Sequence, residues 1–325
     1  MEGDELCFPQ LNTSCRKLKR SHFDTVCIHI ILSSISLLTA ALNLLVIISI
    51  SHFKQLHTPT NLLLLSLAVS DFFVVLLVIF QITLIEGCWY FGDLVCVLYS
   101  ALDLVITSSS VGTMVLISVD RYAAICYPLH YPTKVTQRRV QICVSLCWIC
   151  SLFYAGLLMK ESLKQLGRFN SCIGECVIDF DFTKQFVDLM LTFILPISVI
   201  IVLYLRVFVV AVSQARAMRS NITALSLQRS GKVTAKKSEL KAARTLGVVV
   251  LVFLTCLCPL FCVLLTGQEA LINPSSLVLV FCLFYFNSCL NPIIYAFFYP
   301  WFRKCIKVIV TLQILKSSSC NTNVL

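Results

Sequence analysis

The sequence predicts an all-α membrane protein: a bundle of seven membrane-spanning helices with a short amphipathic helix after the seventh. Of its 325 residues, 58% are apolar and only 13% are charged, and the mean hydropathy is +0.89. Soluble domains carry about 25% charged residues, so a soluble fold would need a core far too large for its surface. The apolar residues also gather in segments of about 20 or more, which is the length that crosses a bilayer as a helix.

Seven segments are long enough to span, and we treat residues 1–325 as one domain built from them. The first residues show no pattern of a secretory signal peptide. The remaining parts are an N-terminal tail at 1–25, a third inner loop at 213–244, and a C-terminal segment at 300–325 that starts with the amphipathic helix. The expected spans are Val26–Ile50, Asn61–Ile85, Leu94–Cys126, Val140–Met159, Phe186–Val212, Thr245–Thr266 and Ser276–Phe298.

Basic residues predict the orientation of the bundle. The loop at 213–244 holds eight Lys or Arg residues against a single acid, Glu239. The loop after the third span and the segment after the seventh are basic as well. Because cytoplasmic loops carry an excess of Lys and Arg, we expect these parts inside the cell and the N-terminus outside, in the plasma membrane. The net charge of +10 then reflects topology and contact with the lipid bilayer rather than nucleic acid.

The 18 cysteines separate by compartment. Those inside the spans are expected to pack as small apolar side chains, and Cys305 on the inner side is a candidate for palmitoylation. Asn12 begins an Asn-Thr-Ser glycosylation sequon in the outer tail. An even number of cysteines in an oxidising compartment predicts disulfides, but six allow many pairings, so the pattern leaves the partners open. The six outer cysteines are Cys7, Cys15, Cys88, Cys96, Cys172 and Cys176.

The third span carries an acid near each end. Asp103 and Asp120 are 17 residues apart, which is about 25 Å along a helix. The hydrocarbon layer of a bilayer is about 30 Å thick, so we expect one carboxylate near each face. An ionisable residue inside a span is costly and is therefore a functional candidate. For Asp103 we weigh a counter-ion for a cationic ligand, bound through charge-assisted hydrogen bonds, against an acid that only holds helices together.

Two other spans hold acids. Asp71 lies in the second span and needs a polar partner or an ion. We weigh a sodium pocket there against a water-filled polar core without a specific ion. Asp188 opens the apolar run of the fifth span, where the wet end of a helix explains it as well as a functional role does. Further along that span, Pro196 is expected to interrupt the helix hydrogen bonds locally. The candidate partners of Asp71 are Ser110, Asn287, Ser288 and Asn291.

The triplet Asp120-Arg121-Tyr122 stands at the inner end of the third span, with Pro128 and Leu129 after it. Glu239 heads the sixth span. An ion pair between Arg121 and Glu239 would hold the helices closed at rest, and the alternative is a solvated glutamate.

The end of the seventh span supplies the decisive motif. It contains Asn291-Pro292-x-x-Tyr295, and together with the Asp-Arg-Tyr triplet this is similar to the class A, or rhodopsin-type, G-protein-coupled receptors over the whole chain. Three further features resemble the trace-amine-associated receptors, most of which are olfactory amine receptors coupled to a stimulatory G protein. These features are the continuation to Tyr299 and Trp301-Phe302, the inner-loop run at 52–61, and the pair Cys172/Cys176 with Cys88-Trp89-Tyr90.

The resemblance implies a ligand site. Asp103 matches the amine-binding acid of the family, and Tyr285 matches its usual hydrogen-bond partner. Asp188 falls where diamine-sensing members, such as cadaverine receptors, carry a second acid. Thr107, one turn deeper than Asp103, is expected either at the floor of the ligand pocket or bonded back to its own helix, and Phe261 completes the expected set. The implied ligand is a small amine, most simply a diamine such as cadaverine, and the implied output is a stimulatory or olfactory-type heterotrimeric G protein that raises cyclic AMP in an olfactory sensory neuron.

The resemblance also implies disulfides and coupling residues. Cys96 and Cys176 match the bond between the third helix and the second outer loop. N-terminal cysteines tie down outer loops in this family, so Cys7 and Cys15 should have partners among Cys172 and Cys88. No cofactor is expected, apart from sodium. The implied coupling residues are Asp120, Arg121, Tyr122, Tyr204, Glu239, Phe253, Asn291, Pro292 and Tyr295.

The sequence departs from class A receptors at Leu257, where Trp is usual, and at Leu42, where Gly is usual. Leu257 makes the floor of the ligand pocket smaller and aliphatic. We therefore expect Phe253 or Phe261 to take over the role of this Trp in coupling the ligand to the movement of the helices. The alternatives are a monoamine receptor with a structural Asp188, and a class A receptor for a peptide or lipid. A transporter should show repeated halves and broken helices, which are absent, and no nucleophile–base or metal constellation suggests an enzyme.

Overall fold

The computed structural model describes residues 5–18, 21–168, 170–178, 180–222, 247–263, 274–315, 319–321 and 324. The regular elements within these residues are helices, and isolated β-bridges in the loops pair Leu6 with Arg16 and Ser14 with Ile173. Six helices are long and apolar enough to cross a membrane, and a shorter apolar helix, Gly247–Val263, occupies the described part of the sixth span. The prediction of an all-α membrane bundle is confirmed.

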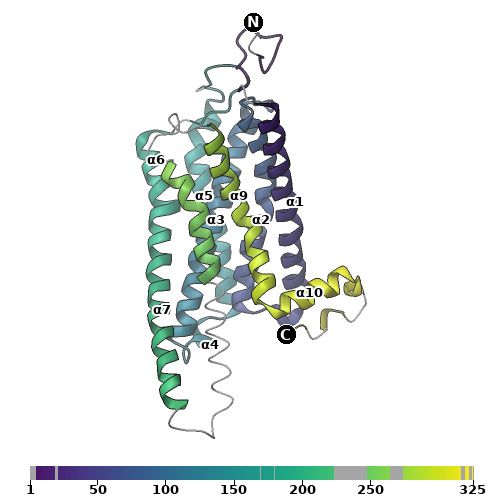
Figure 1. Ribbon diagram of the computed structural model, residues 1–325. Helices are drawn as coiled ribbons and strands as arrows, with labels where there is room; N and C mark the ends of the chain where they lie inside the picture. Colours follow the sequence, from purple (N-terminus) through teal and green to yellow (C-terminus); the bar gives the residue numbers. More distant parts are fainter. Residues whose placement is uncertain are drawn as a thin grey trace.

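The long helices lie side by side in one bundle (Figure 1). Six of the seven expected spans fall inside these helices, and the sixth, Thr245–Thr266, extends beyond the described residues at both ends. The long helices are α1 (His22–His52), α2 (Pro59–Ile85), α3 (Asp93–Cys126), α5 (Gln137–Lys164), the continuous run of α6 (Phe182–Leu189), η2 (Met190–Ile194) and α7 (Leu195–Ile222), and α9 (Pro274–Phe298).

Short helices connect and follow the long ones. We call the end of the bundle that carries Asp120 the inner end and the opposite one the outer end. α10 runs outward to the side from the inner end of α9 (Figure 1). The short elements are η1 (Lys54–Leu56), α4 (Tyr131–Lys134), α10 (Pro300–Val310), η4 (Gln313–Leu315) and η5 (Ser319–Asn321).

Local sequence explains where two helices begin. The Thr58 hydroxyl accepts a hydrogen bond of 3.2 Å from the backbone N–H of Asn61, and Pro59 occupies the first turn of α2. The Thr136 hydroxyl accepts from the N–H of Arg139 at 3.4 Å and caps α5 in the same way. Such caps satisfy N–H groups that the first helical turn leaves without partners, and proline suits this turn because it has no N–H.

The fifth span differs from its prediction in length. It begins at Phe182 and continues to Ile222, so the first ten residues of the predicted loop at 213–244 are helical. This stretch has no Gly or Pro and is rich in Ala, Arg and Gln, which favour helix. A π turn at Met190–Ile194 stands directly before Pro196. Proline clashes with the carbonyl four residues earlier, so the expected local interruption takes the form of this π turn.

Apolar side chains fill the bundle and also cover its outside. Phe53, Phe253 and Tyr295 are among the largest fully buried side chains. On the outer surface of the helices, Leu37 is 72% exposed and Phe153 is 69% exposed. Extended apolar surfaces of this kind mark contact with a membrane or a partner, and here they belong to helices of spanning length. The side chains exposed on the helices are therefore the lipid-facing surface.

The amphipathic helix α10 buries Trp301, Phe302 and Cys305. The Arg303 side chain donates to the backbone oxygens of Ala296 and Phe297 at 2.9 and 3.0 Å, which closes the end of α9. Burial raises the pKa of the Cys305 thiol to about 11. Cys305 is fully buried in this conformation, and its palmitoylation stays a prediction.

Candidate ligand and coupling sites

Three disulfides tie the N-terminal tail and the second outer loop over the outer end of the bundle. Cys96 at the start of α3 is bonded to Cys176 in the loop, which is the pairing that the resemblance implies. The other bonds join Cys7 to Cys88 and Cys15 to Cys172, so the structure selects one of the open pairings. Backbone hydrogen bonds also hold the second outer loop in place. The N–H of Cys15 in the tail donates to the oxygen of Ile173 at 2.9 Å, and the N–H of Trp89 donates to the oxygen of Gly174 at 2.7 Å.

Asp103 lies two turns below Cys96 on α3 and is partly buried. Among the residues that the structure describes, no side chain forms a hydrogen bond or ion pair with its carboxylate. The carboxylate of Asp188 is near enough to repel it electrostatically. The negative charge of Asp103 is therefore not neutralised by this part of the chain.

Tyr285 does not bind Asp103 in this conformation. Its hydroxyl donates to Oε1 of Gln81 at 3.2 Å, and the hydroxyl of Tyr99 donates to the same oxygen at 2.7 Å. A phenol has one proton to donate, and the amide oxygen from α2 accepts it, so the expected Tyr285–Asp103 bond is wrong for this state. Sequence reasoning missed Gln81, although a lone glutamine in the apolar run of the second span was a usable signal.

Asp188 lies in the last turn of α6, just before the π turn. The hydroxyl of Tyr154 on α5 donates to Oδ1 of Asp188 at 2.8 Å. The hydroxyl of Thr192 donates to the backbone oxygen of Asp188 at 2.7 Å. Within the described residues, no cationic side chain pairs with Asp188. Tyr154 was not anticipated either, because nothing in its apolar surroundings distinguishes it from a packing residue.

Phe261 and Thr107 lie in different surroundings. The ring of Phe261 stacks on that of Phe193, with centroids 4.1 Å apart and planes at 13°. Thr107 instead lines a small cavity of about 30 Å³ together with Asp71, Phe253 and Leu257. Thr107 therefore lines the deeper polar cavity, and Leu257 forms part of the apolar wall of that cavity. The predicted place of Thr107 beside the ligand stays a prediction.

The deeper cavity brings together the residues predicted around Asp71. Nδ2 of Asn291 donates to Oδ2 of Asp71 at 2.8 Å, and Ser110 and Asn287 line the same cavity. Within the described residues, the Oδ1 atoms of Asn287 and Asn291 are buried without a hydrogen-bond donor. An unpaired buried acceptor is costly. The arrangement thus suits a small cation or a water molecule, because the cavity is large enough for either and offers polar partners.

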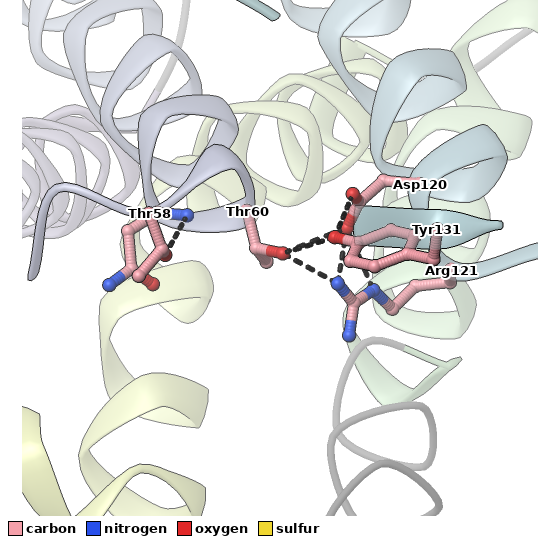
Figure 2. A network of polar contacts seen from close by, with 6 residues as sticks. Thr58, Thr60, Asp120, Arg121 and Tyr131 are labelled. Atoms are coloured by element: carbon pink, nitrogen blue, oxygen red, sulfur yellow. Dashed lines mark hydrogen bonds and ion pairs between the residues drawn. The ribbon is translucent and has the colours of Figure 1, made fainter. Parts of the chain in front are cut away.

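At the inner end, Arg121 is held by its neighbour and by α2 (Figure 2). Its Nε donates to Oδ2 of Asp120 at 3.0 Å and its Nη2 donates to the Thr60 hydroxyl at 2.6 Å; Nη2 also bonds to Oδ2 of Asp120. Thr60 donates to that same oxygen at 2.9 Å, and the hydroxyl of Tyr131 on α4 donates to Oδ1 at 2.7 Å. Both oxygens of Asp120 are therefore paired.

Tyr131 remains a donor at neutral pH. Its burial and the negative charge of Asp120 raise the pKa of Tyr131 to about 12. Sequence reasoning missed Thr60, which is 60 residues from Asp120 in the chain, and Tyr131, which is only 11 residues away but lies on the separate short helix α4. Glu239, the expected partner of Arg121, lies outside the described residues.

No other predicted coupling residue that the structure describes forms a hydrogen bond within this network. Among the described residues, the hydroxyls of Tyr204 and Tyr295 are buried without a hydrogen-bond partner, and the charge of Arg121 acts on Tyr204. Pro292 stands inside α9. The Tyr122 hydroxyl lies 3.4 Å from that of Tyr127 and takes no part in the bonds to Asp120.

A seven-helix bundle with acids at its outer end and a paired Asp-Arg at its inner end defines a membrane receptor of the rhodopsin class. The family model described as "7 transmembrane receptor (rhodopsin family)" matches residues 42–295. Membership implies a small-molecule ligand and a heterotrimeric G protein as partners, and a location in the plasma membrane. The members of this family are receptors, not enzymes.

Similar proteins narrow this class. Trace amine-associated receptor 13c of Danio rerio is 39% identical, covering 99% of this chain and 96% of the relative. Trace amine-associated receptor 4 of Mus musculus is 37% identical over 98% and 95% of the two chains, and trace amine-associated receptor 6 of Homo sapiens is 39% identical over the same shares. The chain therefore belongs to the trace amine-associated receptors, and the resemblance seen in the sequence is confirmed.

Proposed function

We propose that this receptor binds small cationic amines through Asp103 and uses Asp188 as a second counter-ion for a diamine such as cadaverine. In this proposal the N-terminus is extracellular, and the receptor signals through a stimulatory or olfactory G protein that raises cyclic AMP in an olfactory sensory neuron. The observation that carries the proposal is the pair of mutually repelling carboxylates on α3 and α6, neither of which has a cationic partner among the described residues.

A diamine suits this pair of acids for an electrostatic reason. Packed helix axes are about 8–10 Å apart, and two carboxylates at that separation repel by about 2 kcal/mol at an effective dielectric constant near 20. A dication with about five methylenes removes the repulsion and forms a charge-assisted hydrogen bond with each acid. A monoamine leaves Asp188 without a cation. The names of the relatives, trace amine-associated receptors, support an amine ligand in general.

A monoamine receptor is the second candidate. It is favoured by the hydrogen bond from Tyr154, which already satisfies one oxygen of Asp188 inside the bundle. In that case Asp188 connects α5 to α6 and has no role toward a ligand.

The deciding experiment is a cyclic AMP dose–response series over diamines of increasing chain length and matched monoamines. We expect the potency of the wild type to peak near cadaverine, and Asp188→Ala to weaken the diamines while sparing an apolar monoamine. Equal losses for both ligand types in Asp188→Ala would support the second candidate. The surface expression of each variant, measured in the same cells, is the control.

We also propose a sodium ion at Asp71, Ser110, Asn287 and Asn291. Two buried amide oxygens without a hydrogen-bond partner among the described residues support it: Oδ1 of Asn287, which lines the cavity, and Oδ1 of Asn291, whose Nδ2 binds Asp71. A bound cation that favours the resting state should lower amine potency. Replacing sodium with choline in the medium should therefore raise potency in the wild type and leave Asp71→Asn unchanged. The same response in both receptors would exclude the site.

For coupling, we propose that Arg121 leaves Asp120 on activation and engages the G protein, with Tyr122, Tyr204, Phe253, Pro292 and Tyr295 in the moving region. The hydroxyls of Tyr204 and Tyr295 support this, because within the described part of the chain they have no hydrogen-bond partner and can form new bonds. A resting pair of Arg121 with Glu239 predicts higher basal activity in Glu239→Ala, and unchanged basal activity would argue against it.

Asn12 is exposed in the tail, and we propose it as a glycosylation site, which a glycosidase-induced mobility shift would reveal.

A further inference from the structure

We propose that Tyr154 is a positioning residue that sets the preference for diamines over monoamines, by holding the Asp188 carboxylate in the orientation that a second ammonium requires. This inference rests on the proposed function, because it assumes that Asp188 contacts the ligand. It assigns to α5 a part in ligand selection that neither the sequence motifs nor the disulfide cap suggests.

The contact is specific in its atoms. The Tyr154 hydroxyl donates to Oδ1 of Asp188 at 2.8 Å from the adjacent helix, and both side chains are partly buried. A carboxylate has two oxygens with about four lone-pair sites, so this bond leaves Oδ2 available for a ligand. The same bond that satisfies Asp188 in the absence of ligand therefore does not compete with an ammonium.

The backbone around Asp188 leaves the orientation of its carboxylate to be decided by Tyr154. The π turn at Met190–Ile194 follows at once, and π turns are frequent at functional sites. The Thr192 hydroxyl binds the backbone oxygen of Asp188 at 2.7 Å and so holds the main chain. The terminal torsion of an aspartate is broad and nearly two-fold. A bond to Oδ1 is what fixes the direction in which Oδ2 points.

Fixing the acid affects the two ligand types differently. Immobilising a flexible group at a binding site costs free energy that preorganisation avoids. A diamine must pair with Asp188 and gains from the fixed carboxylate, whereas a monoamine on Asp103 does not need it. The length of the best diamine should also depend on Tyr154, because a carboxylate that rotates freely accepts ammonium groups at several distances.

The test compares four receptors: the wild type, Tyr154→Phe, Asp188→Ala and the double variant. The probes are diamines with three to seven methylenes, numbers chosen to bracket a span of about five, and pentylamine as the matched monoamine. Tyr90→Phe is the control, since Tyr90 is 43% exposed and its ring packs on Phe8 in the outer tail. Cyclic AMP potency is normalised to receptor at the cell surface.

We expect Tyr154→Phe to lower cadaverine potency by about three- to tenfold, the size of a preorganisation effect for one side chain. Pentylamine should change by less than about twofold on the same grounds. The chain-length profile of the diamines should flatten. In the Asp188→Ala background, Tyr154→Phe should have no further effect, because its partner is gone.

Equal losses of cadaverine and pentylamine potency in Tyr154→Phe would overturn the inference. So would a loss of cadaverine potency that Tyr154→Phe causes to the same extent in the Asp188→Ala background as in the wild type. A selective loss of diamine in Asp188→Ala but not in Tyr154→Phe would overturn it while leaving the proposed function intact. A wild type without diamine preference would instead overturn the proposed function. If Tyr154→Phe does not reach the surface, Tyr154→Met serves in its place, because it also removes the hydroxyl that binds Asp188 and keeps an apolar side chain in the bundle. An unchanged diamine preference in Tyr154→Met would overturn the inference.

Discussion

The two ends of α3 carry the same residue type in opposite states. At the inner end, Asp120 is 4% exposed and both of its oxygens are bonded, to Arg121, Thr60 and Tyr131. At the outer end, Asp103 has no bonded partner among the described residues and faces the repulsion of Asp188. An acid that is paired within the protein holds its helices together. An acid left unpaired in a membrane-spanning bundle is costly, and that cost favours the binding of a cation from outside.

The ends also differ in what holds them together. The outer end relies on covalent bonds, with three disulfides among the described residues that fasten the tail and loop. The inner end relies on a reversible network of hydrogen bonds among α2, α3 and α4 (Figure 2). In the proposed function, a fixed outer end preserves the ligand site, and hydrogen bonds at the inner end can break and re-form during coupling.

The largest expected effect is at Asp103. In Asp103→Ala the ammonium loses its only strong partner, and losing one member of a buried charge pair costs about 3–5 kcal/mol. Amine potency should fall by more than about 100-fold, which corresponds to that energy, while surface expression is preserved because Asp103 makes no bond in the described structure. Unchanged potency in a cyclic AMP assay would show that the outer acid is not the counter-ion.

The next effect concerns the covalent outer end. Cys96→Ser opens the bond to Cys176 across 80 residues, and such a loss costs about 2–5 kcal/mol. Delivery to the cell surface should fall strongly, as flow cytometry of an N-terminal tag would measure. Cys143→Ser is the matched control, because Cys143 is an exposed free cysteine on α5 and should change little. Finding Cys96 as a free thiol in active receptor, by mass mapping, would contradict the assignment.

The smallest effect is at the reversible inner end. Tyr131→Phe removes one of the bonds to Asp120, and a hydrogen bond to a charged group contributes about 1.5–3 kcal/mol. Other bonds to Asp120 remain, so we expect basal cyclic AMP to rise by about two- to fivefold, less than the full bond would give. Tyr127→Phe is the control, since its hydroxyl makes only a long, exposed contact with Tyr122. Basal signalling equal in both variants would show that the network does not restrain activation.

These outcomes separate the two ends. Loss of response in Asp103→Ala with normal expression, together with gain of basal activity in Tyr131→Phe, would establish recognition at one end and restraint at the other. If Tyr131→Phe instead lowers surface expression and Asp103→Ala does the same, the two acids have the same structural role and the contrast between them disappears.

The sequence by itself determined the features that depend on local composition and spacing. Apolar segments of spanning length predict helices because each helix satisfies its own backbone hydrogen bonds in lipid. The separation of Asp103 and Asp120 along one helix follows from its rise per residue. The helical extension to Ile222 was also a local property, and it was missed because hydropathy, rather than helix propensity, was used to end the span.

Only the tertiary structure decided which side chains meet across helices. The bond of Tyr285 to Gln81 rather than Asp103, the bond of Tyr154 to Asp188, and the choice of Cys88 as partner of Cys7 all join residues far apart in the chain. A hydrogen bond depends on atomic positions to within a few tenths of an ångström. Those positions are set by the rotation and packing of whole helices against one another, which no single segment of sequence encodes.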